Sequence, residues 1–258
     1  MLIHIWRIRT YNGVIAEVAP PARRGARGLV VLAPGCPSVP CAKEALMFLV
    51  REGFWGAYVR YGGSWESEGA FLEREPTDDV LAVAAALRKG ARDAWSREVV
   101  RVDNNLPLFV VGGSFGGPAA LFASGRTEVA RAVALSPVVD WRATQRGVEP
   151  PREWLRLLRE GFGGAYRDIH QAHLRALSRN RWYTPVGEPE RVDPRKVLVI
   201  HAQDDPVVPF EEVAAFARKQ LIALTLYRRG GHFGVSDIAR NARLWARVAR
   251  FLARTEHP

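Results

Sequence analysis

Hydrophobic residues in this chain form short continuous runs separated by longer amphipathic stretches. Such runs are typical of strands that are buried on both faces of a sheet. They predict strands at Leu29–Ala33, Ala57–Tyr61, Leu108–Val111, Ala130–Leu135, Lys196–His201 and Ile222–Tyr227. Helical periodicity lies between them, at Cys41–Arg51, Thr77–Ala91, Pro118–Ser124, Pro209–Gln220 and Val235–Ala253. Because strand and helix alternate, we expect an α/β fold with a mostly parallel sheet and helices on both faces.

The N-terminal segment has a different pattern. Leu2–Thr10 and Val14–Val18 alternate apolar with polar residues around Asn12-Gly13, a strong hairpin signal. We predict an antiparallel pair there. A signal peptide needs a continuous apolar stretch instead, and the longest apolar run, Val80–Leu87, is shorter than the roughly 20 residues that cross a bilayer. We therefore expect a cytoplasmic protein that does not contact a membrane.

The alternation of strand and helix stops over residues 137–194. Helical patterns occur at Trp154–Glu160 and Ile169–Leu177, and no strand is predicted. We interpret the chain as a single domain, 1–258, with a helical insertion at 137–194. The aromatic residues of the insertion either form a partial lid that helps to shape a substrate pocket or pack as the insertion's own core; they are Trp141, Trp154, Phe162 and Tyr166.

Composition excludes several classes of protein. The chain has 258 residues, 48% of them hydrophobic and 25% charged, which excludes a disordered, collagen-like or disulfide-framed chain. The net charge is +10, and 33 of the 37 basic residues are arginines spread along the whole sequence, a bias that fits a GC-rich genome or life at high temperature. One stripe at helical spacing reads as the solvated face of a helix, with an anion-binding surface as the alternative: Arg240, Arg243, Arg247, Arg250 and Arg254. We expect no nucleic-acid partner.

The two cysteines give no sign of a metal site. Cys36 and Cys41 lie five positions apart, with no His or Cys at the spacing of zinc ligands. We expect reduced thiols, with a local disulfide as the alternative. No metal and no organic cofactor is implied.

The most informative motif follows the strand Leu108–Val111. That strand runs directly into Gly112-Gly113-Ser114-Phe115-Gly116-Gly117, and a helix begins at once. This is G-x-S-x-G in the strand–turn–helix context that a nucleophile elbow requires. We predict that Ser114 is a nucleophile at the carboxyl end of the sheet, near the positive end of the next helix. The alternative is a tight structural turn.

A serine nucleophile needs a base, and the base needs an acid partner that fixes its tautomer. On this type of fold the order along the chain is Ser, then Asp or Glu, then His. Of the six histidines, only His232 lies on a glycine-flanked loop just after a strand in that order. Asp204 and Asp205 both follow the strand that ends at His201, and Asp140 is a third candidate for the acid.

An oxyanion hole needs two backbone N–H donors. One is expected from the residue after the nucleophile, which is Phe115. The other is expected from the loop after the strand Leu29–Ala33, where the best candidate is Cys36 in Pro34-Gly35-Cys36-Pro37.

Over nearly its full length the chain resembles the α/β-hydrolase superfamily, and within it the catalytic domain of the prolyl oligopeptidase family and related esterases. The matching segments are Gly112–Gly117, Ser136–Trp141, Asp205–Pro209 and Gly231-His232. The segment Asp205–Pro209 resembles the D-x-x-V-P turn whose aspartate is the triad acid in many of these enzymes. This implies Asp205 as the acid, with Asp204 as the fallback. Pro34 stands where relatives carry His or Tyr.

The resemblance implies a serine hydrolase that cleaves a small acyl ester through an acyl-enzyme intermediate, with Ser114, His232 and Asp205 as the triad. A peptidase or acyl-peptide hydrolase acting on short peptides is the alternative. It is less favoured because no β-propeller precedes the hydrolase pattern in this sequence. A hydrolase fold that binds a partner without catalysis is the alternative from another class, and a homo-oligomer stays open.

Overall fold

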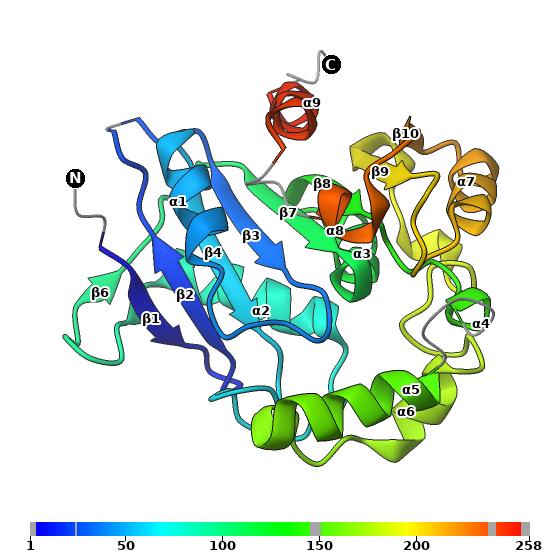
Figure 1. The fold of residues 1–258 in the computed structure, drawn as a ribbon. Helices are drawn as coiled ribbons and strands as arrows, with labels where there is room; N and C mark the ends of the chain where they lie inside the picture. The colour runs from blue at the N-terminus through cyan, green and yellow to red at the C-terminus, as the bar shows by residue number, and fades with distance from the viewer. Residues whose placement is uncertain (1–3, 24, 145–150, 237–240, 254–258) are drawn as a thin grey trace.

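Eight strands of the described residues form one large sheet (Figure 1). The computed structural model describes residues 4–23, 25–144, 151–236 and 241–253. The sheet strands in this part are β1 (Trp6–Arg9), β2 (Ile15–Ala19), β3 (Leu29–Ala33), β4 (Trp55–Arg60), β7 (Leu108–Gly113), β8 (Val129–Leu135), β9 (Val197–Ala202) and β10 (Ala223–Tyr227). Their order is β1-β2-β4-β3-β7-β8-β9-β10. The pairs β1–β2 and β2–β4 are antiparallel and all the others are parallel, which confirms the predicted fold class.

The N-terminal hairpin turns at Asn12-Gly13, as the sequence predicts. Gly13 has φ +79°, a left-handed conformation that glycine adopts without strain. A Cβ at this position would lie 2.6 Å from the Cβ of Glu68, so there is no room for a side chain. The N–H of Thr10 donates to the carbonyl of Val14 (2.9 Å) and closes the turn.

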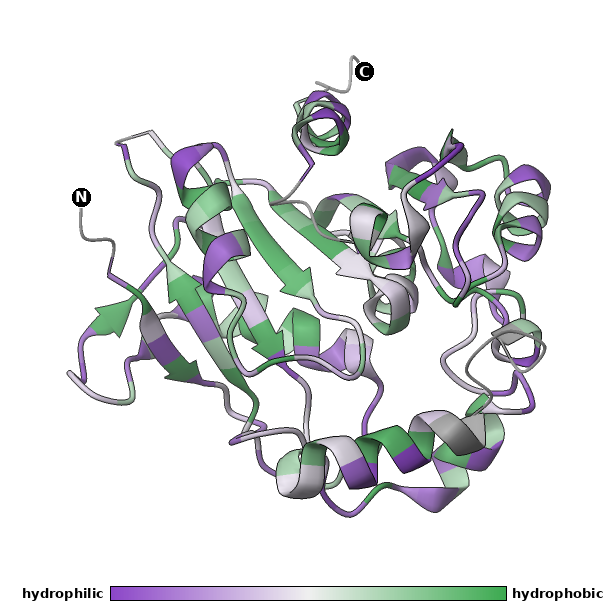
Figure 2. Cartoon of the chain, viewed as in Figure 1, coloured by the Kyte–Doolittle hydropathy of each residue, from purple (hydrophilic) through white to green (hydrophobic). Residues whose placement is uncertain are grey.

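Helices cover both faces of the sheet. Along β3 the side chains alternate between the two faces. Val31 and Ala33 pack on the face covered by α2 (Pro76–Lys89), α3 (Gly117–Ala123) and α7 (Phe210–Lys219). Val30 and Leu32 pack on the face covered by α1 (Lys43–Arg51) and α9 (Ala242–Leu252). Figure 2 shows β3 and β7 mainly in the green of hydrophobic residues, as strands buried on both faces require.

The C-terminal helix predicted over Val235–Ala253 is wrong as one element. The structure has α8 (Gly231–Ser236) and α9, and residues 237–240 between them lie outside the described part. Asn241 starts α9, because its side-chain oxygen accepts the N–H of Leu244 (3.0 Å) in an N-cap. The described arginines of the predicted stripe are exposed, as for a solvated face; they are Arg243, Arg247 and Arg250.

One small sheet was not predicted. The strands β5 (Ala91–Arg92) and β6 (Val99–Val100) form an antiparallel pair of two residues each, too short to produce an alternating pattern. The turn between them is held by Asp93, whose carboxylate accepts the backbone N–H groups of Trp95 (3.1 Å) and Ser96 (2.7 Å). The same side chain accepts the N–H of Arg7 (2.8 Å) and so joins this small sheet to β1.

The described residues of 137–194 form short helices joined by loops and turns, and none of the named strands begins there. Their helices are α4 (Trp141–Thr144), α5 (Pro151–Arg156) and α6 (Gln171–Leu177), with a π-helical turn at Leu157–Gly161 and 3-10 turns at Gly163–Ala165, Pro189–Arg191 and Pro194–Lys196. Backbone hydrogen bonds tie the segment to the loop after β4. The N–H of Trp65 donates to Ala165 (2.7 Å), and that of His170 donates to Phe71 (2.8 Å). No helix among the described residues is both long and apolar enough to cross a bilayer.

Candidate active site

Ser114 lies at a sharp turn between β7 and α3. A single 3-10 turn, Ser114–Gly116, connects the two elements, and Ser114 has φ +52°, a left-handed conformation that costs energy for a residue with a side chain. The glycines on either side make the turn possible. A Cβ at Gly112 would collide with the carbonyl oxygen of Gly116, and one at Gly116 with the carbonyl of Ala33. The packing therefore explains the spacing of the motif.

Tyr183 braces this turn, and no sequence motif had singled it out. Its side chain is fully buried. The hydroxyl accepts the N–H of Ala119 (3.1 Å) and donates to the carbonyl of Phe115 (2.7 Å). One side chain thus connects the residue after Ser114 to the first turns of α3, and it comes from the segment 137–194.

Asp205 and His232 form a hydrogen-bonded pair. Asp205 follows β9, and one of its carboxylate oxygens lies 2.8 Å from Nδ1 of His232. The other oxygen accepts the N–H groups of Val207 and Val208, both at 2.9 Å. Burial by itself would raise the pKa of Asp205, but the hydrogen bond and charge of His232, with the two N–H donors, bring that pKa below its ordinary value.

His232 lies in the first turn of α8, so the predicted position on a loop is wrong in this detail. Asp204 holds the segment just before it. The carboxylate of Asp204 accepts the N–H groups of Gly230 (3.3 Å) and Gly231 (2.8 Å). Asp140, the third candidate for the acid, instead accepts the N–H of Arg142 (2.7 Å) and the side-chain amide of Asn180 (2.5 Å).

A second histidine lies behind the pair. His201 is fully buried on β9, and its Nε2 lies 3.0 Å from the carbonyl of Val208 and 3.7 Å from the carboxylate of Asp205. Burial lowers the pKa of His201, so the ring is neutral near pH 7 and its Nε2–H donates to Val208. His201 thereby supports the turn that carries Asp205.

The loop 34–40 passes over Ser114. A Cβ on Gly35 would lie 3.4 Å from the Cβ of Ser114, and the loop contains Cys36, the predicted second oxyanion donor. Side chains from outside the loop bind its backbone. Pro34 O accepts from Tyr61 (2.9 Å), Cys36 O from Trp154 (2.9 Å), Ser38 O from Trp65 (3.2 Å), Val39 O from Tyr58 (3.0 Å) and Pro40 O from Arg60 (2.5 Å).

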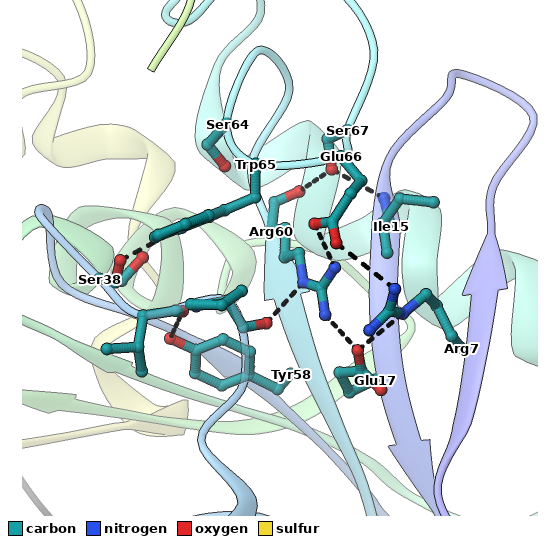
Figure 3. A network of polar contacts seen from close by, with 12 residues as sticks. Arg7, Ile15, Glu17, Ser38, Tyr58, Arg60, Ser64, Trp65, Glu66 and Ser67 are labelled. Atoms are coloured by element: carbon teal, nitrogen blue, oxygen red, sulfur yellow. Dashed lines mark hydrogen bonds and ion pairs between the residues drawn. The ribbon is translucent and has the colours of Figure 1, made fainter. Parts of the chain in front are cut away.

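Arg60 connects this loop to the N-terminal hairpin (Figure 3). Its side chain is fully buried, and its guanidinium pairs with both Glu17 on β2 and Glu66 on the loop after β4. Arg7 on β1 pairs with the same Glu17 (2.9 Å). The cluster therefore joins three strands and two loops. Within it, Arg60 donates one guanidinium N–H to the carbonyl of Pro40 in the loop above Ser114.

Ser114 and His232 line one cavity of about 650 Å³. Cys36 and Cys41 also line it, and no disulfide joins them. Of the described residues of the segment 137–194, Leu157 alone is among its walls. Three predicted lid aromatics are buried around Phe115 and Phe71, which favours the interpretation that they form core: Trp141, Trp154 and Tyr166.

The described residues contain no group of three His, Cys, Asp or Glu side chains placed to hold a metal ion. The site instead brings together a serine at a strained turn, a histidine hydrogen-bonded to a buried carboxylate, and a loop with a fixed backbone. Phe115, predicted to supply one oxyanion donor, follows the serine directly within the 3-10 turn. These are the groups that acyl transfer requires.

Comparisons with known proteins give the family. A sequence profile of the prolyl oligopeptidase family matches residues 43–256. That span contains Ser114, Asp205 and His232, whereas Cys36 precedes it. A comparison with curated protein sequences gave no significant match.

Solved structures give the same fold. The chain is similar to a puromycin-hydrolysing peptidase of Mycobacterium tuberculosis (20% identity, TM-score 0.66), over 96% of this chain but 38% of that one. It is similar to an esterase of Pyrococcus furiosus (17% identity, TM-score 0.66) over 97% of this chain and 90% of that one. It is also similar to an acylaminoacyl peptidase of Pyrococcus horikoshii (15% identity, TM-score 0.67), over 100% of this chain and 43% of that one. The chain thus spans less than half of the two peptidases and most of the esterase.

Proposed function

The chain belongs to the prolyl oligopeptidase family of serine hydrolases, and from this premise we propose that it cleaves small carboxylic esters with Ser114, His232 and Asp205 as its catalytic groups. The observation that carries the proposal is the 2.8 Å hydrogen bond between Asp205 and His232, at a cavity that Ser114 also lines. The described walls of that cavity include no buried carboxylate that could hold the amino terminus of a peptide. This supports an ester over a peptide as substrate.

In the proposed acylation step, Ser114 Oγ attacks the ester carbonyl. Asp205 accepts the hydrogen bond from Nδ1–H of His232, which leaves Nε2 free to take the serine proton. The N–H groups of Phe115 and Cys36 stabilise the oxyanion of the tetrahedral intermediate. His232 then gives its proton to the leaving alkoxide oxygen, and the acyl group stays on Ser114.

In deacylation the roles repeat with water. His232 removes a proton from the water, which attacks the acyl carbon, and the same two N–H groups stabilise the second oxyanion. Collapse of this intermediate returns the proton to Ser114 Oγ and releases the carboxylic acid. Asp205 stabilises the imidazolium in both halves of the reaction without itself taking up the proton.

The direct test is Ser114→Ala. We expect the wild-type protein to hydrolyse p-nitrophenyl butyrate and to be labelled by a fluorophosphonate probe. The variant should lose the labelling entirely and at least about a thousandfold in kcat, because the nucleophile is gone. Turnover or labelling that persists in the Ala variant would contradict the assignment of Ser114.

Two other outcomes identify the rival functions. If alanine p-nitroanilide is turned over faster than p-nitrophenyl butyrate, measured as kcat/KM, the protein is a peptidase with the same catalytic groups. If the folded wild-type protein is neither labelled nor active, the fold serves a binding role, and charge reversal at the exposed Arg243 and Arg247 would then be the way to locate the partner surface.

A further inference from the structure

The cavity beside Ser114 extends in two directions. On one side its walls are Leu32, Tyr58 and the first turn of α1 with the loop before it. On the other side they are Val207, His232 and Phe233. Ser114 lies between the two parts because β7, which carries it, is flanked by β3 and β4 on one side and by β8 and β9 on the other.

The direction of proton transfer determines which half of the cavity binds the acyl part of an ester and which half binds the alcohol part. In the proposed function His232 returns its proton to the leaving oxygen, so the alcohol part must lie next to His232. Asp205 holds His232 from the end of β9, and therefore the alcohol part belongs on the side of β8 and β9. The acyl chain must then leave the carbonyl carbon in the opposite direction, toward β3, β4 and α1.

Next to Ser114, the walls on the α1 side carry no charged side chain. Leu32 and Val111 form the floor at the carboxyl ends of β3 and β7, and Ala45 lines the cavity from α1. The hydroxyl of Tyr58 already donates to Val39 (3.0 Å). Burial raises the pKa of Tyr58 to about 12, and burial also raises the pKa of the Cys41 thiol, so both side chains stay neutral near pH 7.

Charged side chains on this side occur only where the cavity opens. Among its described walls the charged residues near α1 are Lys43 and Glu44, and both are exposed to solvent. An apolar chain that enters from Ser114 therefore meets hydrocarbon first and charge only at the far rim. A carboxylate or ammonium partway along that chain would lose its hydration among walls that carry no charge.

The opposite face of the sheet is closed to the substrate next to Ser114. The ring of Phe115 stacks on Trp154 with 5.8 Å between ring centres and meets Tyr183 at 5.4 Å. Trp154 also donates to Cys36 O, so its position is fixed by packing and by a hydrogen bond. The aromatic side chains of the segment 137–194 thus fill the space under that segment, and the open space lies beneath α1.

We infer that the space between the first turn of α1 and the strand ends of β3, β4 and β7 is the acyl subsite, and that it selects uncharged acyl groups of medium length. This inference rests on the proposed function and adds the substrate class. The cavity volume of about 650 Å³ is within the usual range of small-molecule sites, large enough for an acyl chain and an alcohol together.

The wild-type protein provides the first test. We expect kcat/KM for p-nitrophenyl esters to rise about fourfold with each methylene buried, from acetate through butyrate to hexanoate. Mono-p-nitrophenyl glutarate, whose acyl chain ends in a carboxylate, should be at least about tenfold worse than hexanoate. A flat or falling series, or equal turnover of the glutarate, would overturn the subsite. Absence of all ester turnover and of fluorophosphonate labelling would instead overturn the proposed function.

A variant that fills the subsite provides the second test. Ala45→Trp should lower the ratio of hexanoate to acetate kcat/KM by roughly tenfold or more, while retained fluorophosphonate labelling shows that the variant is folded with a reactive serine. The matched control is Ala172→Trp on the exposed surface of α6, which should leave the ratio unchanged. If Ala45→Trp does not fold, the milder Ala42→Leu, which also lines the cavity, tests the same ratio. An unchanged ratio in the folded variant contradicts the inference.

Discussion

Asp204 and Asp205 are neighbours in the chain, yet their carboxylates do different work. Asp205 binds the imidazole of His232, whereas Asp204 binds backbone N–H groups just before it. The pKa of Asp205 in the folded protein lies below its ordinary value. The ionised form therefore stabilises the fold at pH values above the ordinary pKa of an aspartate. The contribution is lost as the pH falls through the lowered pKa.

This division of roles predicts different effects of the same substitution. Asp205→Asn should lower kcat by roughly a thousandfold to ten-thousandfold, because the amide no longer holds His232 in the required tautomer. Asp204→Asn keeps an oxygen that can accept the N–H of Gly231, and it should cost less than about tenfold. Steady-state kinetics on p-nitrophenyl butyrate measure both. Equal losses in the two variants would contradict the assignment of Asp205 as the acid.

The sequence identifies both aspartates as candidates for the triad acid, but their spacing does not show which of them binds the histidine. The orientation of Asp205 depends on the N–H groups of Val207 and Val208, which point at its carboxylate only after the turn has folded. Tyr183 was out of reach for a related reason. Nothing local distinguishes it from other tyrosines, and its role comes from packing against a turn far away in the chain.

At the scale of elements, prediction worked where a pattern is long and local. The strand β3 has a continuous apolar sequence and lies at the residues predicted for it. The errors occurred where the signal is a single residue. Asn241 is an N-cap that divides the predicted C-terminal helix, and β5 and β6 are shorter than one period of alternation.

Helix α2 begins with a buried acid whose titration should be measurable. Asp79 is 2% exposed, and burial raises its pKa to about 6, although the N–H of Gly62 (2.7 Å) and the Arg74 guanidinium act in the opposite direction. The folded protein therefore holds this proton to higher pH than the unfolded chain does. Stability from this group is fully present below the ordinary pKa and falls as the pH rises toward 6.

Asp79→Asn should remove that dependence. The amide keeps an acceptor for Gly62 and does not titrate. Relative to wild type, the variant should gain about 2 kcal/mol in the free energy of unfolding between about pH 4.5 and about pH 7.5. Urea denaturation at the two pH values measures the difference. Parallel changes with pH in both proteins would mean that Asp79 keeps an ordinary pKa.

At the scale of the whole molecule, the buried Arg60 links the N-terminal hairpin to the loop above Ser114. Arg60→Met should lower the free energy of unfolding by about 3–5 kcal/mol, because Glu17 is left buried with a weaker partner. Replacing both residues, Glu17→Met with Arg60→Met, should recover most of that loss, since no buried charge then remains. Chemical denaturation gives both values. A single variant as stable as wild type would contradict the role given to the pair.

The location of the cavity is also a property of the whole molecule, and no local pattern revealed it. The segment 137–194 has enough aromatic residues to line a pocket or to fill one. The outcome depends on Phe115, which follows Ser114 and draws Trp154 into the core. Only the tertiary arrangement shows that the open space lies on the other side.

The hydrogen bonds that hold the loop 34–40 have a consequence for how this protein can change over time. They end on the loop's carbonyl groups, which every sequence possesses. Side chains in the loop can therefore be exchanged without displacing the backbone that passes over Ser114. A proline at position 34 is compatible with this arrangement, and the side chain at position 36, which lines the cavity, can change and alter substrate preference while the chemistry is kept.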